Sequence, residues 1–167
     1  MIKKVLIAED HESANISVRK TLEDLGISQP TYTYYCDDAF LQVEKAIAEN
    51  KPFDLLITDL SFDEDDRPQK IADGIELIKV IRNLQPKIKV LVFSGEGKMA
   101  MIDHLFKESK INAYVRKARR DVEELKNALL AIQKNKNYIS KPLRRSINQK
   151  NTFEFSTYDI SIINSSC

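Results

Sequence analysis

The fold is decided by the stretch Phe53-Asp-Leu-Leu-Ile-Thr-Asp59-Leu60, a short apolar run that delivers one carboxylate at its end. Leu55, Leu56 and Ile57 favour a strand covered on both faces, because a strand with one solvent face would alternate apolar and polar residues. Asp59 then lies at the carboxyl end of this strand, the edge of an open α/β sheet where ligands and chemistry collect. We therefore interpret the rest of the chain as scaffold and partners for Asp59.

Composition bounds the class of protein before any motif is considered. A chain of 167 residues with 43% hydrophobic and 31% charged residues corresponds to about one globular domain plus an appendage. The net charge of +1 provides no global field that would favour nucleic acid. No apolar run approaches the roughly 18 residues of a transmembrane helix, and the N-terminus does not resemble a signal peptide. We expect a cytoplasmic protein without membrane contact, with Cys36, in an expected strand, and Cys167 as reduced thiols.

Strand and helix patterns alternate along the chain. Buried strands are predicted at residues 4–8, 31–36, 55–57, 88–93 and 112–116. Helices are predicted from about 13 to 25, 38 to 47 and 74 to 85, around 101–106, and from 121 to 135. Five βα units without an internal repeat predict an α/β, doubly wound, five-stranded parallel sheet with helices on both faces. The expected strand order is the flavodoxin-like 2-1-3-4-5.

Chemistry-bearing side chains follow four of the five predicted strands. Glu9 and Asp10 follow the first strand, Asp59 the third, Ser94 the fourth and Lys117 the fifth. Three converging carboxylates repel one another, and a hard divalent cation such as Mg²⁺ relieves this repulsion. Asp59 can then remain ionised and attack phosphorus as a nucleophile. Lys117 and Ser94 would bind oxygens of the transferred phosphoryl group.

These residues give the sequence a family resemblance over about residues 2–137. It resembles a response-regulator receiver domain of bacterial two-component signalling, with Asp59 at the phospho-acceptor position, Ser94 at the switch hydroxyl and Tyr114 at the switch aromatic. Glu9 and Asp10 match the acidic pair, and Lys117 matches the lysine after the fifth strand. The resemblance implies Mg²⁺ held by Glu9, Asp10, Asp59 and the backbone carbonyl of Ser61.

The resemblance also implies partners. A sensor histidine kinase would donate the phosphoryl group, and a homodimer is an assembly that the family allows. The protein would not be an enzyme, beyond catalysing its own phosphoryl transfer and autodephosphorylation.

Two features depart from the family pattern. The segment from Asp59 to Gly74 spans 15 positions, longer than the family's usual tight turn, and carries the acidic run 63–66, which we interpret as solvated. Ala118 follows Lys117 where many members have a cis-proline, which argues against a cis bond there. Lysine without proline is common in the LuxR/NarL-type branch.

Each assigned residue also has a purely structural alternative. Glu9 and Asp10 could cap the following helix, and Asp59 could be an ordinary turn residue. Ser94 could be a plain loop serine, and Lys117 a solvated surface charge. Tyr114 could be a half-buried strand aromatic without a switching role, and His11 and His104 are interpreted as surface residues.

The chain changes character after residue 137. We expect a receiver domain at 1–137, a basic linker at 138–152, and at 153–167 the start of a helix-turn-helix effector domain. That start resembles the LuxR/NarL-type domain, so the expected output is transcriptional. DNA would then be bound only through the missing C-terminal domain, because the chain is expected to be truncated inside its first helix.

Two other functions compete with this interpretation. A receiver that acts only through protein–protein interactions, stand-alone or degenerate, would not need the acceptor chemistry. A flavodoxin-like binder of a small ligand would share the fold class. It would need a phosphate-binding loop after the first strand, where Glu9 and Asp10 would repel an anion.

Overall fold

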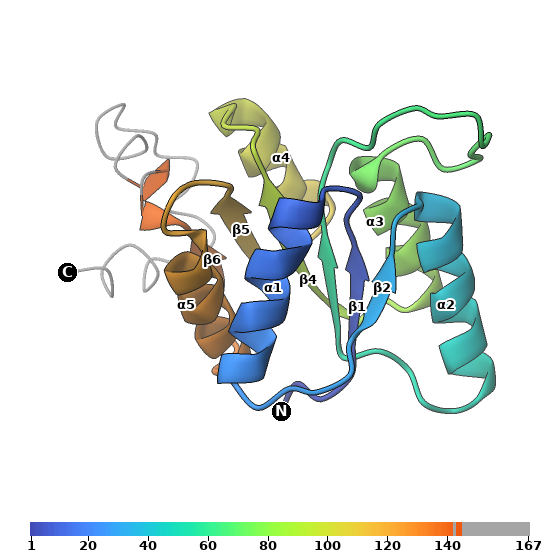
Figure 1. The fold of residues 1–167 in the computed structure, drawn as a ribbon, viewed down its shortest axis with the longest axis horizontal. Helices are drawn as coiled ribbons and strands as arrows, with labels where there is room; N and C mark the ends of the chain where they lie inside the picture. Colours follow the sequence, from blue (N-terminus) through green and yellow to red (C-terminus); the bar gives the residue numbers. More distant parts are fainter. Residues whose placement is uncertain (142, 145–167) are drawn as a thin grey trace.

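The computed structural model describes residues 1–141, 143 and 144, and the tail assigned above to an effector domain lies outside them. Strands and helices alternate through the described chain (Figure 1). The strands are β1 (Val5–Ala8), β2 (Thr31–Thr33), β3 (Leu55–Thr58), β4 (Lys89–Ser94), β5 (Ala113–Arg116) and β6 (Tyr138–Ile139). The helices are α1 (Glu12–Asp24), α2 (Cys36–Ala48), α3 (Gly74–Leu84), α4 (Met99–Glu108) and α5 (Asp121–Gln133).

All the strands pair in parallel in one sheet with the order β2-β1-β3-β4-β5-β6. The predicted α/β class and the order 2-1-3-4-5 are confirmed, but within the described residues the sheet has a sixth strand. The extra strand β6 pairs Tyr138 with Ala113 and Ile139 with Tyr114, so it covers the edge of β5. It adds residues 138–139 to the sheet, beyond the boundary at residue 137 expected from the sequence.

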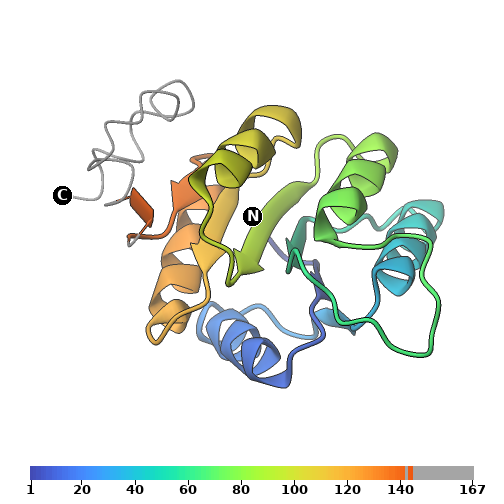
Figure 2. The same ribbon diagram turned by 90° about the horizontal axis from the view of Figure 1, so that it is seen from above.

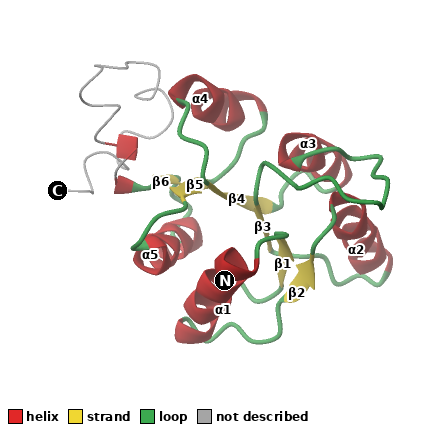
Figure 3. Cartoon of the chain, turned by 45° about the horizontal axis from the view of Figure 1, so that its top comes forward, coloured by secondary structure: helices red, strands yellow, loops and turns green. Residues whose placement is uncertain are grey.

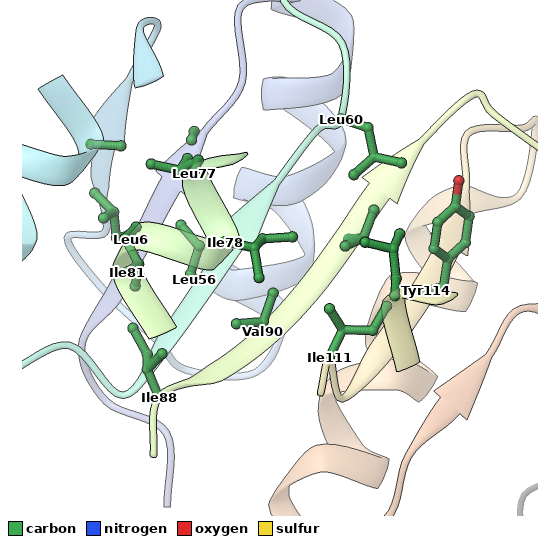
Figure 4. Packing of buried hydrophobic residues seen from close by; sticks show 14 of the residues in the cluster. Leu6, Leu56, Leu60, Leu77, Ile78, Ile81, Ile88, Val90, Ile111 and Tyr114 are labelled. Carbon is green, nitrogen blue, oxygen red and sulfur yellow. The ribbon is translucent and has the colours of Figure 1, made fainter. Parts of the chain in front are cut away.

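Helices cover both faces of the sheet, with α1 and α5 on one side and α2, α3 and α4 on the other (Figures 2 and 3). Alternate residues of each strand therefore enter different cores. In β1, Leu6 and Ala8 pack with α2 and α3, whereas Val5 and Ile7 pack with α1 and α5. Figure 4 shows the first core, which runs from Leu6 across the sheet to Tyr114. Burial on both faces explains why these strands are continuously apolar.

The second strand is shorter than the sequence predicted, and this corrects the placement of Cys36. Strand β2 ends at Thr33, and Cys36 is the first residue of α2, where it is buried. Asp37 and Asp38 follow in the first turn of α2, where carboxylates interact favourably with the positive end of the helix dipole. The β-branched and aromatic run 31–35 favoured a longer strand, but these two acids favour the helix start.

Gly74 fixes how α3 begins against β3. A Cβ atom at this position would lie 1.9 Å from the backbone oxygen of Asp59, so only glycine permits this approach. The Gly74 N–H donates to the Leu60 carbonyl at 2.9 Å, and the Asp73 side chain caps the helix by accepting from the Glu76 N–H at 2.9 Å. The start of α3 therefore supports the backbone that carries Asp59.

The long loop between β3 and α3 is anchored to the start of α2, although its acidic run was interpreted as solvated. Asp37 accepts hydrogen bonds from the backbone N–H groups of Lys70 and Ile71, each at 2.9 Å. The Arg67 guanidinium forms a two-pronged ion pair with Asp38, at 3.0 and 2.5 Å. The Tyr35 hydroxyl donates to Asp65 at 2.6 Å, so at least one member of the acidic run is bound to the fold.

None of the helices in the described part of the chain has the length and apolar character needed to span a bilayer. The same part contains no cis peptide bond, in agreement with Ala118 in place of the family's cis-proline.

Candidate functional site

The carboxyl ends of β1, β3, β4 and β5 meet at one edge of the sheet and bring the predicted residues together. A cleft of about 510 Å³ opens there, and its lining includes Asp59, Ser94 and Lys117. Glu9 and Asp10 follow β1, and each offers a carboxylate oxygen within 4.8 Å of one from Asp59. Residues from four separate strand ends thus face one another, as the parallel topology requires.

Lys117 joins two of the carboxylates. Its Nζ lies 2.8 Å from Asp59 Oδ2 and 2.9 Å from Glu9 Oε1. Burial lowers the pKa of the Lys117 ammonium, but hydrogen bonds to Asp59 and Glu9 outweigh this, and the pKa lies above its ordinary value. Lys117 is therefore a fixed cation of the site rather than a solvated surface charge.

Asp59 is held by the backbone that follows it. Its side chain is about 5% exposed, and Oδ1 accepts hydrogen bonds from the N–H groups of Leu60 at 2.7 Å and Ser61 at 3.5 Å. Its own N–H donates to the Ala8 carbonyl of β1 at 3.1 Å. The carboxylate therefore has one oxygen fixed by the main chain and the other directed at Lys117.

Glu9 and Asp10 occupy different environments. Glu9 is almost fully buried at 2% exposure, whereas the Asp10 side chain is 14% exposed. Burial raises the pKa of the Glu9 carboxyl; the Lys117 ammonium opposes this rise, and the charge of Asp59 adds to it. Asp10 Oδ2 accepts from the Asp63 N–H of the long loop at 2.8 Å. His11 is the N-cap of α1 and its side chain makes no capping hydrogen bond, whereas Glu9 Oε2 accepts from the backbone N–H of His11 at 3.1 Å.

Ser94 and Tyr114 are linked through the loop after β4. The Ser94 hydroxyl accepts from the Glu96 N–H at 3.2 Å, and the Tyr114 hydroxyl donates to the Glu96 carbonyl at 2.7 Å. Tyr114 is fully buried, and burial raises the pKa of its phenol well above the ordinary value. Figure 4 shows this ring at the end of the apolar core, with its hydroxyl on the side of the strand ends.

Ser61 lies in the same cleft, immediately after Asp59. Its N–H contacts Asp59 Oδ1, as described above, and this contact fixes the turn that carries its carbonyl. The sequence placed this carbonyl among the metal ligands, and that role stays a prediction.

His11 also belongs to the cluster, although it was interpreted as a surface residue. Its side chain is 48% exposed, yet Nδ1 lies 3.2 Å from Glu9 Oε2, 3.1 Å from Asp10 Oδ1 and 3.8 Å from Asp59 Oδ2. Its Nε2 lies 3.6 Å from Asp63 Oδ2. The signal for it was present in the sequence, since His11 directly follows the acidic pair. His104, by contrast, is exposed on α4.

The cluster has the donors for a divalent cation. Glu9, Asp10, His11 and Asp59 each offer one ligand atom, and these atoms lie within 4.8 Å of one another. Asp10 Oδ1 is buried and accepts no hydrogen bond from the described residues, and Glu9 Oε1 is paired with the Lys117 ammonium at 2.9 Å, so both oxygens keep lone pairs for a metal. Carboxylate oxygens in this number suit a hard cation such as Mg²⁺.

Comparison with known proteins adds evidence from outside this chain. The model of the family described as "Response regulator receiver domain" matches residues 5–130. No curated protein matches the sequence.

Solved structures share this fold. The isolated REC domain of RcsB from Salmonella enterica serovar Typhimurium, in the presence of phosphomimetic BeF₃⁻, is 26% identical, with a TM-score of 0.70 over 87% of this chain and 98% of that one. A structure of two RcsB dimers bound to two parallel DNAs is 27% identical, with a TM-score of 0.64 over 87% of this chain and 67% of that one. A LuxR-family response regulator from Aurantimonas sp. SI85-9A1 has a TM-score of 0.74 at 19% identity, over 90% of this chain and 99% of that one, and indicates the fold alone.

Proposed function

This chain belongs to the response regulator receiver domain family, and on that premise we propose that it accepts a phosphoryl group on Asp59 from a sensor histidine kinase. The observation that carries the proposal is the contact of Lys117 Nζ with both Asp59 Oδ2 and Glu9 Oε1, next to Asp10. A buried carboxylate beside a fixed cation and further acids is the arrangement that the transfer needs. A structural salt bridge alone would not need the additional buried acids.

Glu9, Asp10, Asp59 and the Ser61 carbonyl would hold Mg²⁺, with Asp10 the most direct of the acidic pair. When bound, Mg²⁺ supplies positive charge that offsets the carboxylates and the oxygens of the incoming phosphoryl group.

Asp59 provides the nucleophile. A lone pair of its carboxylate forms a new O–P bond while the P–N bond of the kinase phosphohistidine breaks. The electron pair of that bond remains on the imidazole nitrogen, which then takes up a proton. The hydrogen bonds from Leu60 and Ser61 orient the Asp59 carboxylate before the reaction, so little reorganisation is needed.

Lys117 and Ser94 bind the product. The Lys117 ammonium already lies 2.8 Å from Asp59, so a short movement pairs it with a phosphoryl oxygen. The Ser94 hydroxyl donates to another oxygen when its side chain rotates toward Asp59, and this rotation breaks its hydrogen bond with Glu96. Because the Glu96 carbonyl also accepts from Tyr114, the change reaches β5 through this one loop.

The output that this receiver controls is transcription, through a DNA-binding domain after the linker. The fold and sequence likeness to RcsB, which has been solved as dimers on DNA, supports this output and a homodimeric assembly. We place the reaction in the cytoplasm, where the buried free thiol of Cys36 stays reduced.

A receiver that acts only by protein–protein interaction would tolerate loss of the residues that support phosphorylation. In this chain the acceptor aspartate, the acidic pair and the lysine are all present and lie together, which favours a phospho-acceptor. The alternative of a flavodoxin-like binder of a small ligand lacks support, because Glu9 and Asp10 occupy the place where such a protein needs a phosphate-binding loop.

Phosphorylation can be measured on the intact protein. After incubation with acetyl phosphate and Mg²⁺, we expect mass spectrometry to show one added phosphoryl group, and chelation of Mg²⁺ should abolish the addition. Asp59→Asn should remain unmodified, because an amide is not a nucleophile for this transfer. Asp66→Asn is the matched control, since Asp66 is an exposed acid of the neighbouring loop.

The proposal fails if Asp59→Asn gains the phosphoryl group as fully as the wild type. It also fails if addition proceeds equally in the absence of divalent metal.

A further inference from the structure

Arg116 adds a second cation to the cleft that holds Asp59. It is the last residue of β5, and it lines this cleft together with Asp59, Ser94 and Lys117. Within the part of the chain that the structure describes, no carboxylate pairs with its guanidinium. Lys117, by contrast, is already engaged with two acids, as described above. The cleft therefore contains one cation that the resting site does not use.

The guanidinium rests against Gly97 in the loop after β4. A Cβ atom on Gly97 would lie 3.0 Å from both Cζ and Nη1 of Arg116, so the glycine leaves room for this group. Glu96, the acid of this loop, is occupied elsewhere, because its Oε1 accepts from the backbone N–H groups of Gly97 at 3.0 Å and Lys98 at 3.2 Å. The guanidinium can therefore leave Gly97 without breaking an ion pair.

The strand register places Arg116 beside the expected switch hydroxyl. Ser94 and Arg116 are partners in the parallel pairing of β4 with β5. Paired residues of neighbouring strands project from the same face of the sheet, about 4.8 Å apart. The arginine side chain is much longer than that of serine, so its guanidinium can reach the group that the Ser94 hydroxyl approaches. The backbone of Arg116 is fixed, since its N–H donates to Ser140 Oγ at 3.1 Å, and only the side chain has to move.

We propose that Arg116 is a further phosphoryl-binding residue of this chain. Once Asp59 carries a phosphoryl group, the guanidinium moves from Gly97 past Ser94 and pairs with the phosphoryl oxygens. The inference rests on the proposed function, because the anion that it concerns is the one formed on Asp59. Phosphorylation adds about one negative charge to the cleft. The planar guanidinium can donate two parallel hydrogen bonds to phosphate oxygens, which the point charge of Lys117 cannot do.

Nuclear magnetic resonance of the full chain tests the contact, with BeF₃⁻ and Mg²⁺ as the probe that imitates the phosphoryl group. The side-chain Nε–H signal of Arg116 is assigned by its loss in Arg116→Lys. We expect BeF₃⁻ to shift this signal and to slow rotation about the Cζ–Nη bonds, because pairing with an anion fixes the guanidinium. Arg119 is the internal control, since it is exposed and does not line the cleft, and its signal should not change.

Affinity for BeF₃⁻ provides the second readout. A titration followed at the Ser94 amide signal should show binding weakened on the order of tenfold in Arg116→Gln, because a charged hydrogen-bond donor is lost. Arg116→Lys should fall between this variant and the wild type, since the ammonium keeps the charge but lacks the planar fork. Arg119→Gln should bind as the wild type does. Both positions are exposed, so the far-UV circular dichroism of all three variants should remain that of the wild type.

The outcomes separate the inference from the proposed function. Unchanged BeF₃⁻ affinity in Arg116→Gln overturns the inference, even if the Arg116 signal moves, because the guanidinium would then only sense a rearranged loop. An equal loss of affinity in Arg116→Gln and Arg119→Gln overturns it as well, since that result indicates a general effect of charge. Both results leave phosphorylation of Asp59 standing. A wild type that neither binds BeF₃⁻ nor becomes phosphorylated overturns the proposed function instead.

Discussion

At the scale of single residues, the site depends on charges that the backbone holds in place. Lys117 neutralises part of a buried acidic cluster, and the N–H groups of Leu60 and Ser61 fix one oxygen of Asp59. Glycine at position 74 is as important as any charged group, because the backbone of α3 contacts the backbone of Asp59 there. Changes to such contacts should affect chemistry and stability together.

Gly74→Ala tests this backbone contact. The new Cβ would lie 1.9 Å from the Asp59 carbonyl oxygen, so the start of α3 or the Asp59 turn must move. We expect a loss of stability of about 1–3 kcal/mol or more, measured by urea unfolding, and slower phosphorylation from acetyl phosphate. Gly95→Ala is the control, because no atom beyond its two chain neighbours lies within 4 Å of its added Cβ. Equal stability of the two variants would contradict this role of Gly74.

Cys36 links burial to the pH dependence of stability. Burial raises the pKa of its thiol from 9.0 to about 12. The thiol ionises more readily in the unfolded chain, so its contribution to stability is complete below pH 9 and is lost as the pH rises toward 12. In that range, Cys36→Ala should remove a slope of up to about 1.4 kcal/mol per pH unit.

The measurement is the difference in unfolding free energy between wild type and Cys36→Ala at pH 8 to 11. Other groups that titrate in this range cancel in the difference. A difference that does not change with pH would show that the thiol is not buried as described.

At the scale of elements, two segments connect the site to the rest of the molecule. The loop between β3 and α3 is anchored to α2 and reaches back to Asp10 through Asp63. Strand β6 pairs with β5 at Ala113 and at Tyr114, the expected switch aromatic. The Ser140 N–H donates to the Tyr114 carbonyl at 3.0 Å. We therefore expect a change in β5 to reach Ser140 through these backbone bonds.

Glu124 of α5 holds β6 in place. Its carboxylate accepts from the Tyr138 hydroxyl at 2.7 Å and from the Lys141 N–H. Glu124→Ala leaves the buried Tyr138 hydroxyl and the part-buried Lys141 N–H without this acceptor, at a cost of about 1–3 kcal/mol for the buried hydroxyl. Hydrogen exchange should then become faster at the Tyr138 and Ser140 amides and stay unchanged in β1.

Glu123→Ala is the matched control for this variant, because Glu123 is its exposed neighbour on α5. Unchanged exchange at Ser140 in Glu124→Ala would show that backbone pairing alone holds the strand.

At the scale of the whole molecule, the sequence predicted the features that depend on hydrophobic patterning, which are the buried strands and their parallel arrangement. The continuous runs around Leu56 and Leu91 predicted doubly covered strands, and the alternation with helices predicted their parallel order. Because the carboxyl ends of parallel strands share one edge, the convergence of Asp59 and Lys117 followed from the topology.

Features that depend on tertiary contacts were missed. Tyr138 and Ile139 form a strand because they pair with the edge of β5 and because the Tyr138 hydroxyl donates to Glu124. A two-residue strand is too short to show a hydrophobic periodicity in the sequence. The position of His11 next to the acidic pair was visible in the sequence, but its approach to Asp59 depends on the pairing of β1 with β3. Local sequence contains no information on such tertiary pairings.

The central claim is that Asp59 is the residue that becomes phosphorylated. The most direct measurement treats the Mg²⁺-dependent phosphoprotein with borohydride, which reduces an aspartyl phosphate to homoserine, and then locates the homoserine by tandem mass spectrometry. We predict homoserine at position 59 and at no other aspartate, and none when Mg²⁺ is chelated. Reduction at Asp10 or another acid, with Asp59 intact, would contradict this account.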